Sequence, residues 1–130
     1  MINNFEEFTD GLNDYERTKL LPIMVKCFKN HVGEENAIKS HQIKSKMEEH
    51  GYDISDARIR KIVHDIRQHS RVPCLVATSK GYFVADKVSQ VSNFIDSLQG
   101  REDAICAIKE AIIVQRDAMR EKLEKRQLDA

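Results

Sequence analysis

Apolar residues recur at helical spacing near the start of the chain. Between Tyr15 and His31 these positions are Leu20, Leu21, Met24, Val25, Cys27 and Phe28. The pattern predicts a helix over this range, with Asp14 as its N-cap. Pro22 lies inside the pattern and removes one backbone donor, so we expect a kink there or a main segment that begins with Pro22 in its first turn. Gly33 is expected to end the helix, and residues 36–38 to form a short strand.

Two further helices are predicted on either side of Gly51. The first begins at Ser40 as N-cap, and Gly51 follows it as a left-handed C-cap. The second runs from Asp56 to His69 behind Ser55, a third cap residue. Its apolar residues fall at i, i+3, i+4 and i+7, which is the spacing of one buried stripe: Ile59, Ile62, Val63 and Ile66.

The face opposite that stripe is polar. At 100° per residue it holds Ala57, Lys61, His64 and Gln68, flanked by Arg60 and Arg67 on one side and by Arg58 and Asp65 on the other. Arg, Lys and Gln pair well with base edges and phosphates, and a major groove about 12 Å wide admits one helix. The pattern is typical of a DNA recognition helix, although an ordinary solvated helix face gives the same pattern.

A hairpin is predicted after this helix. Residues 71–73 contain Pro73 and end the helix, and residues 74–77 and 82–85 then read as two short strands around a loop that contains Gly81. Lys80 lies at the tip of the loop. In a DNA-binding wing it would lie over phosphates or the minor groove; otherwise it is an ordinary loop lysine.

From Asp86 onward the chain holds no proline and one glycine, Gly100. Apolar residues follow a 3-4 spacing: Val88, Val91, Ile95, Leu98, Ile105, Ile112, Met119 and Leu123. Glu102, Lys109 and Arg116 occupy the remaining heptad positions. We expect one of two arrangements. In the first, a long helix forms a homodimer through residues 86–126. In the second, a single helix, or two helices separated by a break near Gly100, packs back on the core. The length of the stripe favours dimerisation, because one small domain cannot cover it.

The predicted order of helix, short strand, helix, turn, helix and hairpin resembles the winged helix-turn-helix family. Segment 54–63, ISDARIRKIV, together with Gly81-Tyr82 resembles the DNA-binding domain of biotin-operon repressors and small winged-helix proteins of phages and integrated elements. The resemblance covers roughly residues 14–85. It implies that Ala57, Arg58, Arg60, Lys61 and His64 lie at the groove and that Lys80 lies in the wing. Asp56 and Asp65 add negative charge to this face.

The charge distribution agrees with that resemblance, although the chain of 130 residues has a formal net charge of zero. Residues 1–38 hold four Lys/Arg and seven Asp/Glu, a net charge of −3. Residues 39–80 hold nine against five, a net charge of +4, and residues 81–130 hold eight against nine, a net charge of −1. The basic excess therefore coincides with the predicted DNA-binding region.

Other classes of protein find little support. We expect no membrane span, because no run of about 18 apolar residues occurs, and no signal peptide, so the predicted location is cytoplasmic. The three cysteines, Cys27, Cys74 and Cys106, lack the paired spacing of a zinc site or a disulfide framework. No phosphate loop, zinc-protease motif or nucleophile elbow is present, so we expect neither an enzyme nor a cofactor.

The sequence thus predicts a mostly α fold with a small β-hairpin: a flexible arm over residues 1–13, a winged helix-turn-helix domain over 14–85 and a helical dimerisation segment over 86–130. A homodimer would place two recognition helices in successive major grooves. We expect Arg58, Arg60 and Arg67 to hold phosphates, and Lys61, His64 and Gln68 to read bases. The function would be phage-like transcription regulation or replication, or alternatively protein–protein interaction without DNA.

Overall fold

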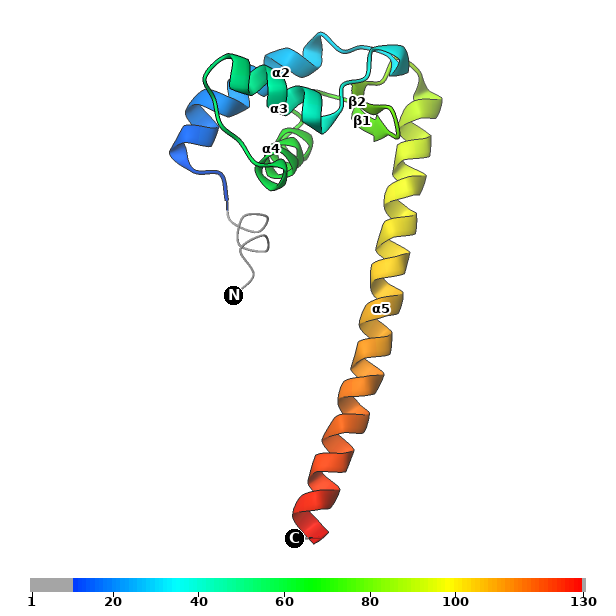
Figure 1. Ribbon diagram of the computed structural model, residues 1–130. Coiled ribbons are helices and arrows are strands. Elements are labelled where there is room, and N and C mark those ends of the chain that lie inside the picture. Colours follow the sequence, from blue (N-terminus) through cyan, green and yellow to red (C-terminus); the bar gives the residue numbers. More distant parts are fainter. Residues whose placement is uncertain (1–10, 130) are drawn as a thin grey trace. The chain divides into compact units, whose positions relative to one another are not determined.

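The computed structural model describes residues 11–129 of the chain. Their elements are η1 (Glu16–Leu20), α2 (Leu21–Lys29), η2 (Glu34–Asn36), α3 (Ser40–Glu49), α4 (Asp56–Gln68), β1 (Leu75–Thr78), β2 (Gly81–Val84) and α5 (Val88–Asp129) (Figure 1). This order confirms a mostly helical chain with one small antiparallel hairpin and a long C-terminal helix. The arm predicted over residues 1–13 lies mainly outside the described residues.

The first helical run, residues 14–29, includes η1 and α2 and begins at a reciprocal cap. The Glu16 N–H donates to Oδ1 of Asn13 at 2.8 Å, and the Asn13 N–H donates to Oε1 of Glu16 at 2.9 Å. The N-cap is therefore Asn13, and the prediction of Asp14 was wrong by one residue; Asp14 pairs with Arg17 instead. Pro22 lies in the first turn of α2, as one of the two alternatives predicted, and the turn before it widens into the π-helical η1.

The turn between α3 and α4 has the predicted glycine and the predicted second cap. Gly51 has a φ of +81°, in the left-handed region that glycine adopts without steric cost. The Ser55 hydroxyl oxygen accepts from the Arg58 N–H at 3.3 Å and caps α4. The cap of α3 differs from the prediction: Lys39 is the N-cap and Ser40 is the first helical residue, because the Gln42 side chain accepts from the Lys39 N–H.

The hairpin pairs Leu75 with Val84 and Thr78 with Gly81, so each strand is shifted by one residue from its predicted range. Ile38 forms a bridge to the free edge of β2: its N–H donates to the Tyr82 carbonyl at 2.9 Å and its carbonyl accepts from the Tyr82 N–H at 2.8 Å. The strand predicted near residues 36–38 is therefore present as a single bridge, and it ties the start of α3 to the hairpin.

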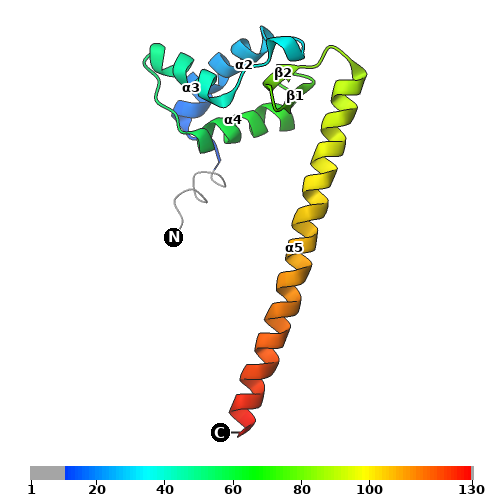
Figure 2. The same cartoon turned by 45° about the vertical axis from the view of Figure 1, so that its right-hand side comes forward.

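One hydrophobic core joins these elements. Its buried side chains come from η1, α2, α3, α4, the hairpin and the loop before β1, among them Leu20, Met24, Phe28, Ile43, Met47, Ile59, Ile62, Val63, Ile66, Val72 and Leu75. All four residues of the predicted stripe of α4 are at most 2% exposed. Two views of the ribbon show α3 against α4 and the hairpin near the C-terminal end of α4 (Figures 1 and 2). The core thus fixes which side of α4 is left to solvent.

Helix α5 is one uninterrupted helix of 42 residues, so the predicted alternative of a break near Gly100 was wrong. Its first residues up to Phe94 belong to the first compact unit, and Ile95 begins the second. The first unit therefore includes the first seven residues of α5, 88–94. No side chain of α5 is buried, and several large apolar side chains are exposed, including Ile95, Leu98, Ile105, Ile108, Ile112, Val114, Met119 and Leu123.

Candidate nucleic-acid interface

Five of the eight predicted DNA-binding residues share the solvent face of α4. Arg60, His64 and Gln68 are exposed, and Ala57 and Lys61 are half-buried beside them. They share one face because residues three, four and seven positions apart lie above one another on a helix, and the buried stripe occupies the other side. This face combines two cationic side chains with an imidazole and an amide, all of which are able to hydrogen-bond to base edges or phosphates.

Arg58 has a different environment from the one predicted. Its Nε donates to Oε2 of Glu16 at 2.6 Å, a second guanidinium nitrogen lies 2.5 Å from Oε1, and it also donates to the Gly11 carbonyl at 3.1 Å. The Arg58 side chain is 14% exposed and that of Glu16 is 4% exposed. This bidentate pair joins the first helical run to α4. The guanidinium of Arg58 is therefore engaged inside the protein, where it has a structural role.

The Glu16 carboxylate titrates abnormally in this environment. Burial by itself raises the pKa of Glu16, but the hydrogen bonds from Arg58 and Asn13 and the positive charge of Arg58 outweigh it. The net effect is a pKa below the usual value, so the carboxylate stays ionised at neutral pH. The sequence did carry a signal for this residue, since Asn13 and Glu16 have the spacing of a capping box.

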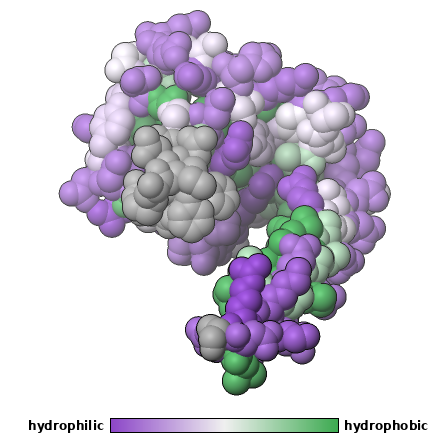
Figure 3. All heavy atoms as spheres, turned by 60° about the horizontal axis from the view of Figure 1, so that its bottom comes forward, coloured by the Kyte–Doolittle hydropathy of each residue, from purple (hydrophilic) through white to green (hydrophobic). Residues whose placement is uncertain are grey.

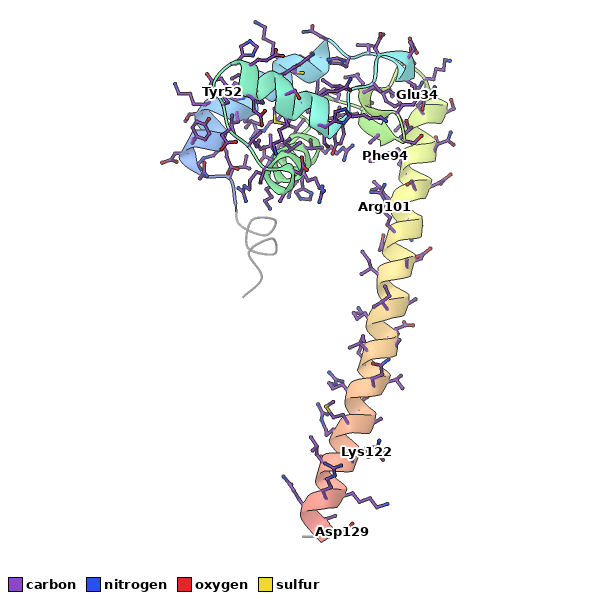
Figure 4. The ribbon with its side chains drawn as sticks, in the orientation of Figure 1. Glu34, Tyr52, Phe94, Arg101, Lys122 and Asp129 are labelled. Carbon is purple, nitrogen blue, oxygen red and sulfur yellow. The ribbon has the colours of Figure 1, made fainter. Side chains whose placement is uncertain are left out.

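Arg67 also differs from its predicted role. Its Nε donates to the Leu75 carbonyl at 2.9 Å, and its guanidinium carbon lies 5.5 Å from the ring centre of Tyr82 and 4.7 Å from that of Phe94. Figure 4 labels Phe94 near the start of α5. Arg67 thus holds the hairpin and the first turns of α5 against the end of α4. These contacts give Arg67 a structural role.

The two acidic residues of α4 are not equivalent. Oδ1 of Asp65 lies 2.8 Å from Nε of Arg71, and Oδ2 lies 3.4 Å from Nδ1 of His69. The ion pair with Arg71 offsets the negative charge of Asp65, a role for Arg71 that sequence reasoning missed because the pair spans the end of the helix. Asp56 is exposed in the first turn of α4, where the helix dipole favours a negative charge.

Lys80 lies at the tip of the hairpin, as predicted. Its side chain is 65% exposed, and its Nζ lies 3.8 Å from Oε1 of Glu34. An exposed ion pair of this length contributes at most about 1 kcal/mol, so it does not hold the ammonium against a competing phosphate.

A feature that the sequence did not reveal is a cavity of about 490 Å³ between α2 and α3. Apolar side chains line part of it, including Ile23, Ile43 and Met47, and Lys26 and Lys46 also face it. These residues come from two helices whose packing the periodicity alone does not fix. Burial raises the pKa of Cys27, which also lines the cavity, although the charge of Lys46 opposes the shift.

Within residues 11–129 no group of three or more His, Cys, Asp or Glu side chains is arranged to hold a metal ion. None of the helices in that range is long and apolar enough to cross a membrane. Comparison of the chain with protein-family models, curated proteins and solved structures finds no match in any of the three.

Proposed function

We propose that this protein binds double-stranded DNA through the solvent face of α4, as the recognition helix of a winged helix-turn-helix domain. The observation that carries the proposal is the division of α4 into two faces: its four-residue apolar stripe is fully buried, and Arg60, Lys61, His64 and Gln68 share the opposite side. A helix supported from behind in this way is able to enter the major groove without unpacking.

The neighbouring elements support the same proposal. The hairpin follows α4, is held to it by Arg67 and presents Lys80 at its tip, which is the place of a wing. Residues 39–80, which contain α3, α4, β1 and the turn after β1, carry the basic excess of the chain, nine Lys/Arg against five Asp/Glu. We assign phosphate contacts to Arg60 and Lys80 and base contacts to Lys61, His64 and Gln68, with Ala57 close to the bases.

The biological role that fits this proposal is a cytoplasmic transcription regulator or a replication-associated protein of phage type, acting as a homodimer through α5. Support for the dimer comes from the exposed apolar side chains of α5. Such a surface on a single helix requires cover from another molecule.

The test is fluorescence anisotropy of labelled duplex DNA across a salt series. We expect Arg60→Ala/Lys61→Ala to weaken binding at least about tenfold, and the log–log salt slope to become shallower by about one for each phosphate that the variant no longer binds. The matched control is Lys19→Ala/Lys29→Ala, which removes the same charge from exposed positions of the first helical run. Equal reductions of affinity in both variants would show that only net charge matters. No binding of duplex at low salt would overturn the proposal and favour a protein partner.

A further inference from the structure

One series of large apolar side chains on α5 is exposed and has the spacing of a helix-pairing surface. Leu98, Ile105, Ile112 and Met119 recur every seven residues, and each is between 45% and 67% exposed. Figure 3 shows hydrophobic residues open to solvent on the helix, and Figure 4 shows its side chains pointing outward along its length. A strict seven-residue recurrence keeps these residues on one side of a supercoiled helix. The partner is therefore expected to be another long helix.

The seam positions that alternate with this series are charged. Glu102, Lys109 and Arg116 also recur every seven residues and take the alternate positions of the same seam. In a parallel, in-register pair of α5 helices each would face its own copy. Three layers, separated by the apolar layers of Ile105 and Ile112, would then juxtapose Glu with Glu, Lys with Lys and Arg with Arg, and each like-charge layer is unfavourable.

We propose that α5 pairs with the α5 of a second copy of this chain, and that the two helices run antiparallel. The inference rests on the homodimer in the proposed function and adds its orientation. In an antiparallel pair the alternate seam positions face the apolar series of the other helix instead of their own copies. The aliphatic stems of Glu, Lys and Arg then lie along apolar side chains while their charged ends reach solvent.

The distribution of charge along α5 gives independent support. Residues 95–110 hold two Lys/Arg and four Asp/Glu, a net charge of −2. Residues 111–126 hold five Lys/Arg and three Asp/Glu, a net charge of +2. An antiparallel pair lays the acidic half of each helix along the basic half of the other, whereas a parallel pair places like against like along its full length.

The first compact unit sets the start of the pairing. Val91 and Phe94 are half-buried in that unit, where Phe94 lies over the guanidinium of Arg67, so the seam begins at Ile95. Two copies of residues 95–126 overlap completely when the midpoint falls between residues 110 and 111. The pairing then extends over about 48 Å of helix, since each residue adds about 1.5 Å.

This register gives specific neighbours across the seam. Leu98 lies opposite Leu123 of the partner subunit, and Glu102 lies opposite Met119 of the partner subunit. Lys109 lies opposite Ile112 of the partner subunit. Gln99 and Arg120 each directly follow a member of the apolar series, so in an antiparallel pair they lie on the same rim of the seam. Gln99 is opposite Lys122 of the partner subunit, and Arg120 of the partner subunit lies two residues further along that rim.

Site-directed cross-linking of the full chain tests the orientation. The exposed Cys74 and Cys106 are replaced by serine, and Gln99→Cys and Arg120→Cys are introduced in separate proteins. The two proteins are mixed to exchange subunits and treated with a short bis-maleimide, and the joined peptides are identified by mass spectrometry. The matched control is Asp117→Cys, which lies on the side of the helix away from the seam.

We expect position 99 to be joined to position 120 in the mixture, whereas either protein alone and the control remain largely uncross-linked. Joined 99–99 and 120–120 peptides from the separate proteins would establish a parallel pair and overturn the inference. A monomer in sedimentation at micromolar concentration would overturn it together with the dimer. The DNA titration is a separate readout: Arg60→Ala/Lys61→Ala is expected to leave the 99–120 cross-link unchanged, so failure of DNA binding and failure of the pairing are distinguishable.

Discussion

The Glu16–Arg58 pair shows what one buried carboxylate does for this domain. Its two partners lie 42 residues apart, and the pair joins the first helical run to the first turns of α4. Because both side chains are withdrawn from water, each depends on the other to offset the cost of its desolvation. The pair thereby fixes the position of α4, and with it the direction of the proposed recognition face.

Replacing Glu16 by glutamine leaves the Arg58 charge uncompensated. We expect Glu16→Gln to lower the free energy of unfolding by about 3 kcal/mol, the usual scale for breaking a buried ion pair. Urea denaturation monitored by circular dichroism measures the loss. The control is Glu48→Gln at an exposed helix position, for which a change within about 0.5 kcal/mol is expected. Equal effects of the two substitutions would show that the pair contributes nothing specific.

The difference in unfolding free energy between wild type and Glu16→Gln is expected to depend on pH. The pKa of Glu16 is lowered in the folded protein, because the hydrogen bonds and charge of its partners outweigh burial. The stability from this carboxylate is therefore complete above its ordinary pKa of 4.5 and is lost as the pH falls through the lower folded value. We expect the difference between wild type and Glu16→Gln to be constant between about pH 5 and 7 and to shrink below that range. A difference that grows on acidification would contradict the assignment.

Gly81 is a second residue whose environment yields a sharp prediction. Its φ is +122°, and a Cβ atom there would lie 2.5 Å from the Ile38 carbonyl oxygen. We expect Gly81→Ala to cost roughly 2–4 kcal/mol, because backbone strain adds to the clash at the Ile38–Tyr82 bridge. Gly51→Ala is the control: its φ is +81° but the space around it is open, so about 1 kcal/mol is expected. Thermal unfolding compares them, and equal destabilisation would show that the approach of Ile38 has no effect.

The three arginines of α4 show how far residue-level prediction reached. Periodicity placed Arg58, Arg60 and Arg67 on the flanks of the polar face, and only Arg60 is exposed there. The flanks of a helix are where a neighbouring element approaches, so a flanking side chain is able to turn toward it. Whether a partner such as Glu16 or Phe94 lies there depends on packing between distant segments, which helical spacing does not determine.

At the scale of elements, the strongest local patterns gave the best predictions. The stripe of α4 and the left-handed Gly51 follow from periodicity and single-residue stereochemistry, and both are present. Pro22 lies in the first turn of α2, which was one of the two alternatives predicted for it. The N-caps at Asn13 and Lys39 were missed by one residue, because adjacent polar residues compete for the same backbone donors. Helix α5 passes through Gly100 because one glycine costs a helix only about 1 kcal/mol, which 42 residues readily absorb.

Gly100 offers a test of α5 as an element. No heavy atom lies within 4 Å of a Cβ built at this position, and in the heptad it falls on the side away from the seam. We expect Gly100→Ala to stabilise the helical assembly by up to about 1 kcal/mol per chain, since alanine restricts the unfolded backbone. Thermal unfolding followed in the far ultraviolet measures the gain, with Ser97→Ala as a control of smaller expected effect. A loss of stability would show that another chain packs closely against Gly100.

At the scale of the whole molecule, the proposed antiparallel pairing would determine which DNA sites the proposed dimer is able to reach. Each first unit joins its α5 at the N-terminal end, so the two junctions lie at opposite ends of the paired helices, about 48 Å apart. Recognition helices in successive major grooves are about 34 Å apart. The proposed pairing therefore favours half-sites more widely spaced than the single helical turn expected from sequence, or two separate duplexes.

Shortening the chain tests the division of roles between the two units. We expect a chain that ends after Phe94 to fold and to sediment as a monomer, because its core and the Arg67–Phe94 contact are intact and residues 95–126 are absent. Its DNA affinity is expected to fall by up to about 10²-fold, since the second domain is no longer tethered. A chain that ends after Asp86 also lacks the Phe94 ring over Arg67, so its unfolding free energy is expected to be lower by at least about 0.5 kcal/mol. Sedimentation, anisotropy and urea denaturation measure the three effects. A chain ending at Phe94 that still dimerises would place the interface in the first unit and leave the apolar series of α5 for a different partner.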